Sequence, residues 1–522
     1  MIRMRLTQAV DRAAVTRAGG LATRMGERSQ NWAQFRSRVS RLAKGLVDLG
    51  VEPGDRVALL AHNSDRYLEW FFAVPWAGGV FVPVNTRLAA PEVAYWLSDS
   101  GSRLLFVDDA FVPMLSDLQG KMDSVEKLVY VGDGPAPEGL VHYESLVEGR
   151  AERADAGRSD DDLAGLFYTG GTTGVSKGVM LSHANLLGNA LNVVPLLGLD
   201  AQTRWLHAGP MFHLADGTGT FAVALMAGGH CFLPRFEPLA ALQAIALERP
   251  THAVLIPTML NMLVHHPEVE NYDLSSLRMV LYGASPMPES VIRRAVGLMP
   301  GVRFMHGYGQ TESAPFLTSL GPEYHDLESP LAAKLGSIGH PAPGVEIRVL
   351  DDQDQQVPRG VVGEICARGI NVMQGYWNKP ELSAQTLRGG WLHTGDGGYL
   401  DEEGFLFIVD RVKDMIISGG ENVYSAEVEN ALYAHPAVAE CAVIGVPDEK
   451  WGERVHAVVR LADSVEADAE TLMAHCHELI AGYKCPRSVE YREEALPLSG
   501  AGKILKTQLR APYWEGREKN VN

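Results

Sequence analysis

Apolar and polar positions follow two different periods along the first part of the chain. From residue 32 to 49, apolar residues recur at helical spacing with arginine and lysine between them, which predicts an amphipathic helix. Short apolar runs at 57–61, 80–84 and 104–108 predict buried strands, and the aromatic-rich segment 67–76 predicts another helix. Because strands and helices alternate, we predict α/β layers in which strands pair in parallel.

The pattern changes after residue 411. There a helix, two short strands and a second helix predict a compact α+β unit, at 425–433, 441–446, 455–461 and 467–480. We therefore predict two domains. Residues 1–410 form a large α/β domain of layered mixed and parallel sheets with helices, and residues 411–522 form a small α+β domain.

The net charge, the cysteines and the length of the apolar runs indicate which partners and which cellular location to expect. The chain has 522 residues, 46% of them apolar, and a formal net charge of −18, which disfavours nucleic acid as a partner. Five scattered cysteines without metal-ligand spacing predict reduced thiols and a cytoplasmic location. No window approaches the roughly 18 apolar residues of a membrane span, so we predict no transmembrane segment.

The segment 168–178, Tyr-Thr-Gly-Gly-Thr-Thr-Gly-Val-Ser-Lys-Gly, lies between two runs that predict strands. Its glycines let the backbone turn toward an anion, and its hydroxyls and lysine add donors and a positive charge. The candidate phosphate ligands are Thr169, Gly170, Gly171, Thr172, Thr173 and Lys177. Glycine follows the lysine, so this is not a Walker A loop, and Mg²⁺ needs a ligand from elsewhere. A flexible linker is the alternative interpretation.

A second motif, 308–312, offers such a ligand. Tyr308 can stack on adenine, Thr311 can bond to an α-phosphate oxygen, and Glu312 presents the hard oxygen that Mg²⁺ prefers. Alone, Gly-Gln-Thr-Glu is more often a turn and a helix cap. Its interpretation as a site therefore depends on the presence of the phosphate loop.

The two motifs resemble those of the adenylate-forming superfamily, which includes acyl- and aryl-CoA synthetases, firefly luciferase and the adenylation domains of peptide synthetases. Further segments match in the family's order over nearly the whole chain. They are 283–285, 391–396, 405–414, 419–420 and 496–506. The resemblance implies ATP, Mg²⁺ and coenzyme A as ligands, with the second domain acting as a mobile lid that carries the catalytic Lys503.

The resemblance carries roles onto individual residues. It implies catalytic roles for Lys503, His213, Thr311 and Glu312, with Glu312 and Thr169 as Mg²⁺ ligands. The implied cofactor-binding residues are Thr169, Gly170, Gly171, Thr172, Thr173, Lys177, Gly283, Ala284, Ser285, Tyr308, Thr311, Asp396, Arg411, Lys413, Gly419, Gly420, Trp451 and Lys503. Among these, Asp396 and Arg411 would bind ribose, Lys413 is the hinge position, and Trp451 is one of three implied contacts to the CoA nucleotide, with Tyr483 and Arg487.

Three other positions have simpler interpretations. A lone histidine beside apolar residues, such as His213, is usually a core residue, but the family places this position in the acyl site. Asp216 is expected to be a loop or cap residue. The segment 375–377, Gly-Tyr-Trp, resembles a family segment that is mainly structural.

The implied reaction is that of a carboxylic acid–CoA ligase. A fatty or aryl carboxylate attacks the α-phosphorus of ATP, giving an acyl-adenylate and diphosphate, and a thiol then displaces AMP. The alternative is a stand-alone enzyme that loads the acyl group onto a carrier protein. The expected partners are the acid, ATP and CoA, and both a monomer and a homodimer stay open.

Overall fold

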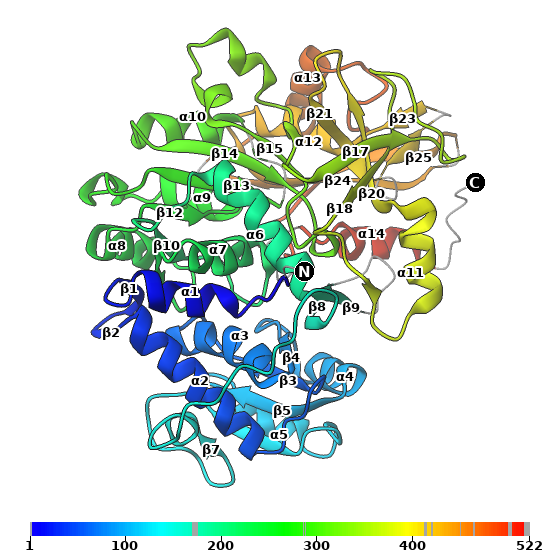
Figure 1. Cartoon of the computed structure of the whole chain (residues 1–522). Helices are drawn as coiled ribbons and strands as arrows, with labels where there is room; N and C mark the ends of the chain where they lie inside the picture. The colour runs from blue at the N-terminus through cyan, green and yellow to red at the C-terminus, as the bar shows by residue number, and fades with distance from the viewer. Residues whose placement is uncertain are drawn as a thin grey trace.

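The computed structural model describes residues 3–169, 176–284, 287, 289–411, 415–418, 421–448, 450–462, 465–498 and 504–515. Figure 1 shows the N-terminal α/β layers at the bottom, a second layered unit above them, and the C-terminal elements at the upper right. Within the described residues, no helix combines the length and the apolar character that a membrane crossing requires.

Two sheets form the body of the large domain. The first follows the order β16 (His340–Pro341), β15 (Thr318–Leu320), β14 (Arg303–Tyr308), β13 (Met279–Gly283), β12 (His252–Val254), β10 (Arg204–His207), β11 (Gly229–Phe232), β1 (Leu21–Met25) and β2 (Arg28–Asn31). The second follows the order β19 (Gly375–Tyr376), β9 (Lys177–Ser182), β8 (Leu163–Thr169), β4 (Val80–Pro83), β3 (Arg56–Leu60), β5 (Ser102–Val107), β6 (Lys127–Tyr130) and β7 (Val141–His142). Both are mixed sheets, with parallel pairing in the centre and antiparallel strands toward an edge.

A smaller antiparallel sheet follows the two large ones in the chain. Its order is β17 (Val345–Leu350), β18 (Gly363–Gly369), β20 (Leu392–Leu400) and β21 (Leu406–Arg411). The C-terminal sheet has the order β23 (Glu421–Val423), β22 (Ile416–Ser418), β25 (Gly452–Leu461) and β24 (Val438–Asp448), with β26 (Ser488–Tyr491) parallel to β25.

Helices cover these sheets. Those of the large domain are α1 (Gln8–Thr16), α2 (Trp32–Asp48), α3 (Asp65–Ala77), α4 (Ala90–Ser100), α5 (Leu115–Leu118), α6 (His183–Leu197), α7 (Leu214–Leu225), α8 (Pro238–Glu248), α9 (Pro257–Val264), α10 (Glu289–Leu298) and α11 (Pro380–Thr386). The last three are α12 (Ser425–Tyr433), α13 (Ala469–Leu479) and α14 (Lys506–Trp514).

The predicted elements are confirmed, with small shifts at their ends. The helix predicted from residue 32 begins there because Asn31 caps it: its side chain accepts the Gln34 N–H at 2.9 Å, and the Gln34 side chain accepts the Asn31 N–H at 2.9 Å. In the C-terminal part, β24 and β25 are longer than predicted, and β22, β23, β26 and α14 were not predicted. Those extra elements are short or lack a clear period.

Buried side chains form separate cores. One large cluster joins the first three sheets and runs from Leu6 to Leu406. Two others consist, among the described residues, only of side chains between Ile416 and Leu509. The chain therefore has a large N-terminal domain and a smaller C-terminal domain, each with apolar packing of its own.

Candidate functional site

The predicted phosphate loop connects two antiparallel strands. β8 ends at Thr169 and β9 begins at Lys177, and these two residues are paired across the ladder. The prediction that the loop links two strands is confirmed. Lys177 places its ammonium 4.6 Å from the centre of the Tyr376 ring, which is a cation–π contact. Gly170, Gly171, Thr172 and Thr173 lie outside the described residues, so their contacts with phosphate stay predictions.

The predicted metal ligand Glu312 lies on a short 3₁₀ turn, Thr311–Ser313, that follows β14. Thr311 and Glu312 are both buried, each with 8% of its surface exposed. The Tyr376 hydroxyl donates to Glu312 Oε1 at 2.8 Å, and the Met373 N–H donates to the Glu312 carbonyl at 2.8 Å. Burial, and next the charge of Glu312, raises the pKa of Tyr376, so the phenol stays protonated and acts as the donor.

The segment 371–376 thus holds the turn in place. Asn371 Nδ2 donates to two carbonyls of the turn region, those of Ser313 and Phe316, each at 2.8 Å. The interpretation of Gly375-Tyr376-Trp377 as mainly structural stays a prediction, to which the structure adds that Tyr376 contacts two predicted site residues, Lys177 and Glu312. The signal that could have identified it is a tyrosine immediately after a glycine at a sheet edge, which is too common to stand out in sequence.

The predicted ribose ligand Asp396 forms a second tyrosine–carboxylate pair. The Tyr308 hydroxyl donates to Asp396 Oδ2 at 2.8 Å, and the two residues are 8% and 7% exposed. Tyr308 is the last residue of β14, whereas Asp396 lies within β20, opposite Arg411 of β21. The sequence placed these two residues in one site, and the structure brings them into direct contact.

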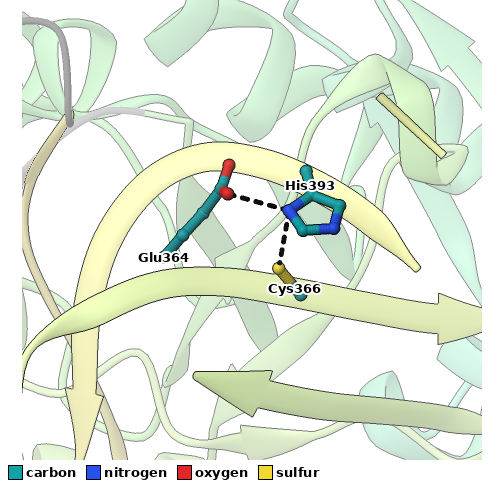
Figure 2. Close-up of side chains that lie close together, drawn as sticks. All are labelled: Glu364, Cys366 and His393. Atoms are coloured by element: carbon teal, nitrogen blue, oxygen red, sulfur yellow. Dashed lines mark hydrogen bonds and ion pairs between the residues drawn. The ribbon is translucent and has the colours of Figure 1, made fainter. Parts of the chain in front are cut away.

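Glu364, Cys366 and His393 lie close together, as Figure 2 shows, and Glu364 contacts the Asp396 turn. Glu364 Oε1 accepts the Gly395 N–H at 3.0 Å, while Glu364 Oε2 lies 2.8 Å from His393 Nδ1. Cys366 Sγ lies 3.2 Å from the same nitrogen. Gly395 has a φ of +74°, a conformation that favours glycine, and the turn then directs Asp396 toward Tyr308. Sequence analysis missed Glu364 and His393 as site residues.

These three residues also offer a metal three ligand atoms within 4.8 Å of one another. Their surroundings favour hydrogen bonding instead. Arg388 Nη2 lies 3.3 Å from Glu364 Oε2, so the carboxylate already pairs with a cation. Burial, and next the charge of Glu364, raises the pKa of the Cys366 thiol to about 12, so the sulfur stays protonated. We assign the cluster to supporting the Asp396 turn.

The predicted acyl-site residue His213 caps helix α7. Its Nδ1 accepts the Ala215 N–H at 3.1 Å, which leaves Nε2 to carry the ring proton of the neutral form. The loop before it is fixed by Asn63, whose side chain donates to the Gly209 carbonyl at 2.7 Å and accepts the Met211 N–H at 2.8 Å. His213 is therefore positioned by a backbone N–H of its own helix and by a preceding loop that the side chain of Asn63 holds in place.

The expectation for Asp216 was wrong. It is 1% exposed in the first turn of α7, and its carboxylate pairs with His207 Nδ1, whose Nε2 contacts His230 Nδ1 at 3.0 Å. Burial, and then His207, lowers the pKa of His230, which stays neutral. The aspartate is an internal partner of β10 and β11 rather than a loop residue. The sequence could not show this buried contact, because only the folded sheet brings His207 and His230 close to Asp216.

Gly283 and Ala284 lie at the end of β13, on the edge where β14 ends with Tyr308. A Cβ on Gly283 would lie 2.0 Å from the Gly307 carbonyl oxygen, so glycine is required by the close approach of the two strands. Ala284 has a φ of +68°, a strained conformation for alanine that is typical of functional turns. Ser285, the third residue of this predicted segment, lies outside the described residues.

In the C-terminal domain the structure brings two of the three predicted CoA contacts together. The Arg487 guanidinium lies 4.4 Å from the centre of the Trp451 ring, while Tyr483 is 42% exposed. Leu498 and Ile504, which both lie within the predicted lysine segment 496–506, form an antiparallel bridge. The predicted residues Lys413, Gly419, Gly420 and Lys503 lie outside the described residues, as does the side chain of Arg411.

Comparison with known proteins gives consistent matches. A family model described as AMP-binding enzyme matches residues 3–377, and one described as AMP-binding enzyme C-terminal domain matches residues 427–503. The chain is 41% identical to a feruloyl-CoA synthase from an Amycolatopsis species over 506 residues, covering 94% of this chain and 96% of that protein. It is 38% identical to an indoleacetate–CoA ligase of Aromatoleum aromaticum over 510 residues, covering 97% and 98% of the two chains.

A solved structure is similar over the same extent. The anthranilate CoA ligase AuaEII in complex with anthranoyl-AMP superposes with a TM-score of 0.90 at 28% identity, and the match covers 98% of this chain and 97% of that one. Both domains of the chain therefore have counterparts in a single known fold.

Proposed function

The chain belongs to the AMP-binding enzyme family, and from that premise we propose that it activates an aromatic carboxylic acid. It is an acyl-CoA synthetase, an AMP-forming acid–thiol ligase that uses ATP and CoA. Supporting the choice of acid, the similar proteins named above act, by their names, on feruloyl, indoleacetate and anthranilate groups, each of which contains an aromatic ring.

One observation carries the assignment of the site. Two carboxylates from different parts of the chain are buried near the end of β14: Glu312 follows this strand, and Asp396 contacts its last residue, Tyr308. Each accepts a tyrosine hydroxyl at 2.8 Å. A tyrosine hydroxyl is a neutral donor, so it orients a carboxylate without placing an opposite charge beside it. In the proposed function Asp396 accepts the ribose hydroxyls, and Glu312 faces the phosphates.

The donor set fits Mg²⁺. Glu312 supplies a buried carboxylate and Thr169 a hydroxyl, which are the hard oxygen ligands that this ion takes. A bound Mg²⁺ would supply charge neutralisation to the phosphates. Lys177 would add a second positive charge, and Thr311, buried beside Glu312, would donate to an α-phosphate oxygen.

The remaining steps involve the C-terminal domain. We propose a boundary at residues 410 and 411 and a hinge at Lys413, with Lys503 positioned against the carboxylate during adenylation. After rotation, Gly419 and Gly420 would line the passage of the thiol, and Trp451 with Arg487 would contact the CoA nucleotide. Homodimer formation and a cytoplasmic location stay predictions. All five cysteines are buried and unpaired, which supports a reducing compartment.

A panel of acids tests the proposal. Purified protein is given Mg²⁺, ATP and one of ferulate, indole-3-acetate, anthranilate or octanoate, and diphosphate and AMP are measured with and without CoA. We expect at least one aromatic acid to release AMP in a CoA-dependent manner and to exceed octanoate in kcat/KM. A preference for octanoate would contradict the aromatic substrate. Diphosphate release without acyl-CoA formation would favour the carrier-protein alternative.

A further inference from the structure

Tyr376 lies on a short strand that is fixed to the strand carrying Lys177. β19 pairs with β9 so that Tyr376 is opposite Val179, and the Trp377 N–H donates to the Gly178 carbonyl at 2.8 Å. The backbone of Tyr376 is therefore tied to the residues that directly follow the predicted phosphate loop.

The other side of this short strand is held by helix α11. The Tyr376 N–H donates to Ser383 Oγ at 2.8 Å, and that hydroxyl donates in turn to the Lys379 carbonyl at 2.7 Å. Gly375, with a φ of +142°, leaves room for this contact, because a Cβ there would lie 2.9 Å from Ser383 Oγ. The ring of Tyr376 consequently has little freedom to move, and its residue is only 5% exposed.

This fixed side chain contacts two oppositely charged groups at once. Its ring faces the Lys177 ammonium at 4.6 Å, and its hydroxyl donates to Glu312 Oε1 at 2.8 Å. A neutral phenol can interact with an ammonium through its face and with a carboxylate through its O–H, without cancelling either charge. Lys177 is the first residue of β9 and Glu312 lies on a three-residue 3₁₀ turn, so each side chain extends from the end of a strand or from a short turn.

We propose that Tyr376 is a positioning residue for adenylation, which sets the spacing and orientation of Lys177 and Glu312 before Mg·ATP binds. This inference rests on the proposed function. The hydroxyl orients the Glu312 carboxylate for the metal, while the ring holds the lysine toward the phosphates. The two contacts act on different ligands, so they can be separated by mutation.

The test measures ATP binding to the full-length protein by isothermal titration calorimetry, with Mg²⁺ and with EDTA. Tyr376→Phe removes only the hydroxyl, and Tyr376→Leu removes the ring as well. Tyr143→Phe is the matched control, because Tyr143 is also a buried tyrosine whose hydroxyl donates to a carboxylate, Glu69 Oε2 at 2.6 Å, within the N-terminal core.

We expect Tyr376→Phe to reduce the Mg²⁺-dependent gain in ATP affinity about tenfold, the scale of one hydrogen bond to a charged group, while affinity in EDTA changes less than twofold. Tyr376→Leu should weaken ATP binding in EDTA as well. Tyr143→Phe should alter neither value, although it lowers the melting temperature.

Two results would overturn the inference. If Tyr376→Phe keeps the full Mg²⁺-dependent gain, the hydroxyl does not orient the metal ligand. If it weakens ATP equally with and without Mg²⁺, its effect is a general loss of structure. A wild-type protein whose ATP affinity does not respond to Mg²⁺ would instead contradict the proposed function, and with it the role of Tyr376.

Discussion

Glu312 and Asp396 are two buried carboxylates that each contact a tyrosine, but different parts of the fold hold them in place. Each accepts a tyrosine hydroxyl at 2.8 Å, and each is less than a tenth exposed. Glu312 lies on a short turn and is oriented by Tyr376 from a separate sheet edge. Asp396 lies within β20 at a place where the pairing with β18 shifts register, and Glu364 holds this turn by accepting the Gly395 N–H and contacting His393.

The same contact, a tyrosine hydroxyl that donates to a carboxylate, therefore differs in importance between the two positions. For Asp396, the strand and the Glu364 cluster already fix the backbone, so its tyrosine is one support among several. For Glu312, the Tyr376 hydroxyl is the side-chain donor to the carboxylate among the described residues. We therefore expect loss of the tyrosine hydroxyl to affect the Glu312 pair more strongly than the Asp396 pair.

Replacing Glu312 should have the largest effect. Glu312→Gln replaces the carboxylate that we propose faces the phosphates while keeping the shape of the side chain, so adenylation should slow about 100- to 1,000-fold, the scale of losing one preorganised charge-stabilising group. The measurement is acid-dependent diphosphate release. Glu323→Gln, an exposed carboxylate a short distance along the chain, is the control and should match wild type. A loss below threefold for Glu312→Gln would contradict a role at the phosphates.

Asp396→Asn should come next. The amide loses a charge-assisted acceptor for ribose, so KM for ATP should rise about 10- to 100-fold while the Mg²⁺ dependence is unchanged. The same variant should bind 2′,3′-dideoxy-ATP as well as wild type does, because that nucleotide lacks both hydroxyls. An equal loss with ATP and with the dideoxy analogue would show that Asp396 does not recognise ribose.

Glu364→Gln tests the support behind Asp396. It weakens the bond to the Gly395 N–H and the pair with His393, so KM for ATP should rise about threefold to tenfold. Glu346→Gln, an exposed carboxylate on the neighbouring strand β17 that pairs with Arg368, should leave KM unchanged. If Glu364→Gln instead alters the Mg²⁺ dependence of activity, Glu364 also acts on the proposed metal ligand Glu312, and its assignment to the Asp396 turn alone is wrong.

Tyr308→Phe should have the smallest effect. The ring remains for stacking on adenine, and β20 with its support still places Asp396, so KM for ATP should rise only about twofold to threefold, near the lower limit for one hydrogen bond. The result is compared with Tyr376→Phe under the same conditions. A larger effect at Tyr308 than at Tyr376 would reverse the proposed order of the two pairs.

Much of the site could be predicted from the sequence because its residues come in short contiguous motifs. The run from Tyr308 to Glu312 and the loop before Lys177 each carry glycine, hydroxyl and charge at a spacing that suggests nucleotide chemistry. The helices and central strands could also be predicted, because the buried face of each element sets the spacing of its apolar residues. The short C-terminal strands β22 and β23 were missed because a strand of three residues leaves no period to detect.

The sequence by itself determined which chemical groups the protein has and which segments carry them: a glycine- and threonine-rich phosphate loop, a tyrosine and a glutamate in one motif, and an aspartate after a tight turn. Only the tertiary structure decided which residues hold those groups in place. Tyr376 reaches Glu312, Glu364 supports the Asp396 turn, and Asp216 pairs with His207. The physical reason is that such contacts depend on strand register and on the packing of distant segments, neither of which leaves a local pattern in the chain.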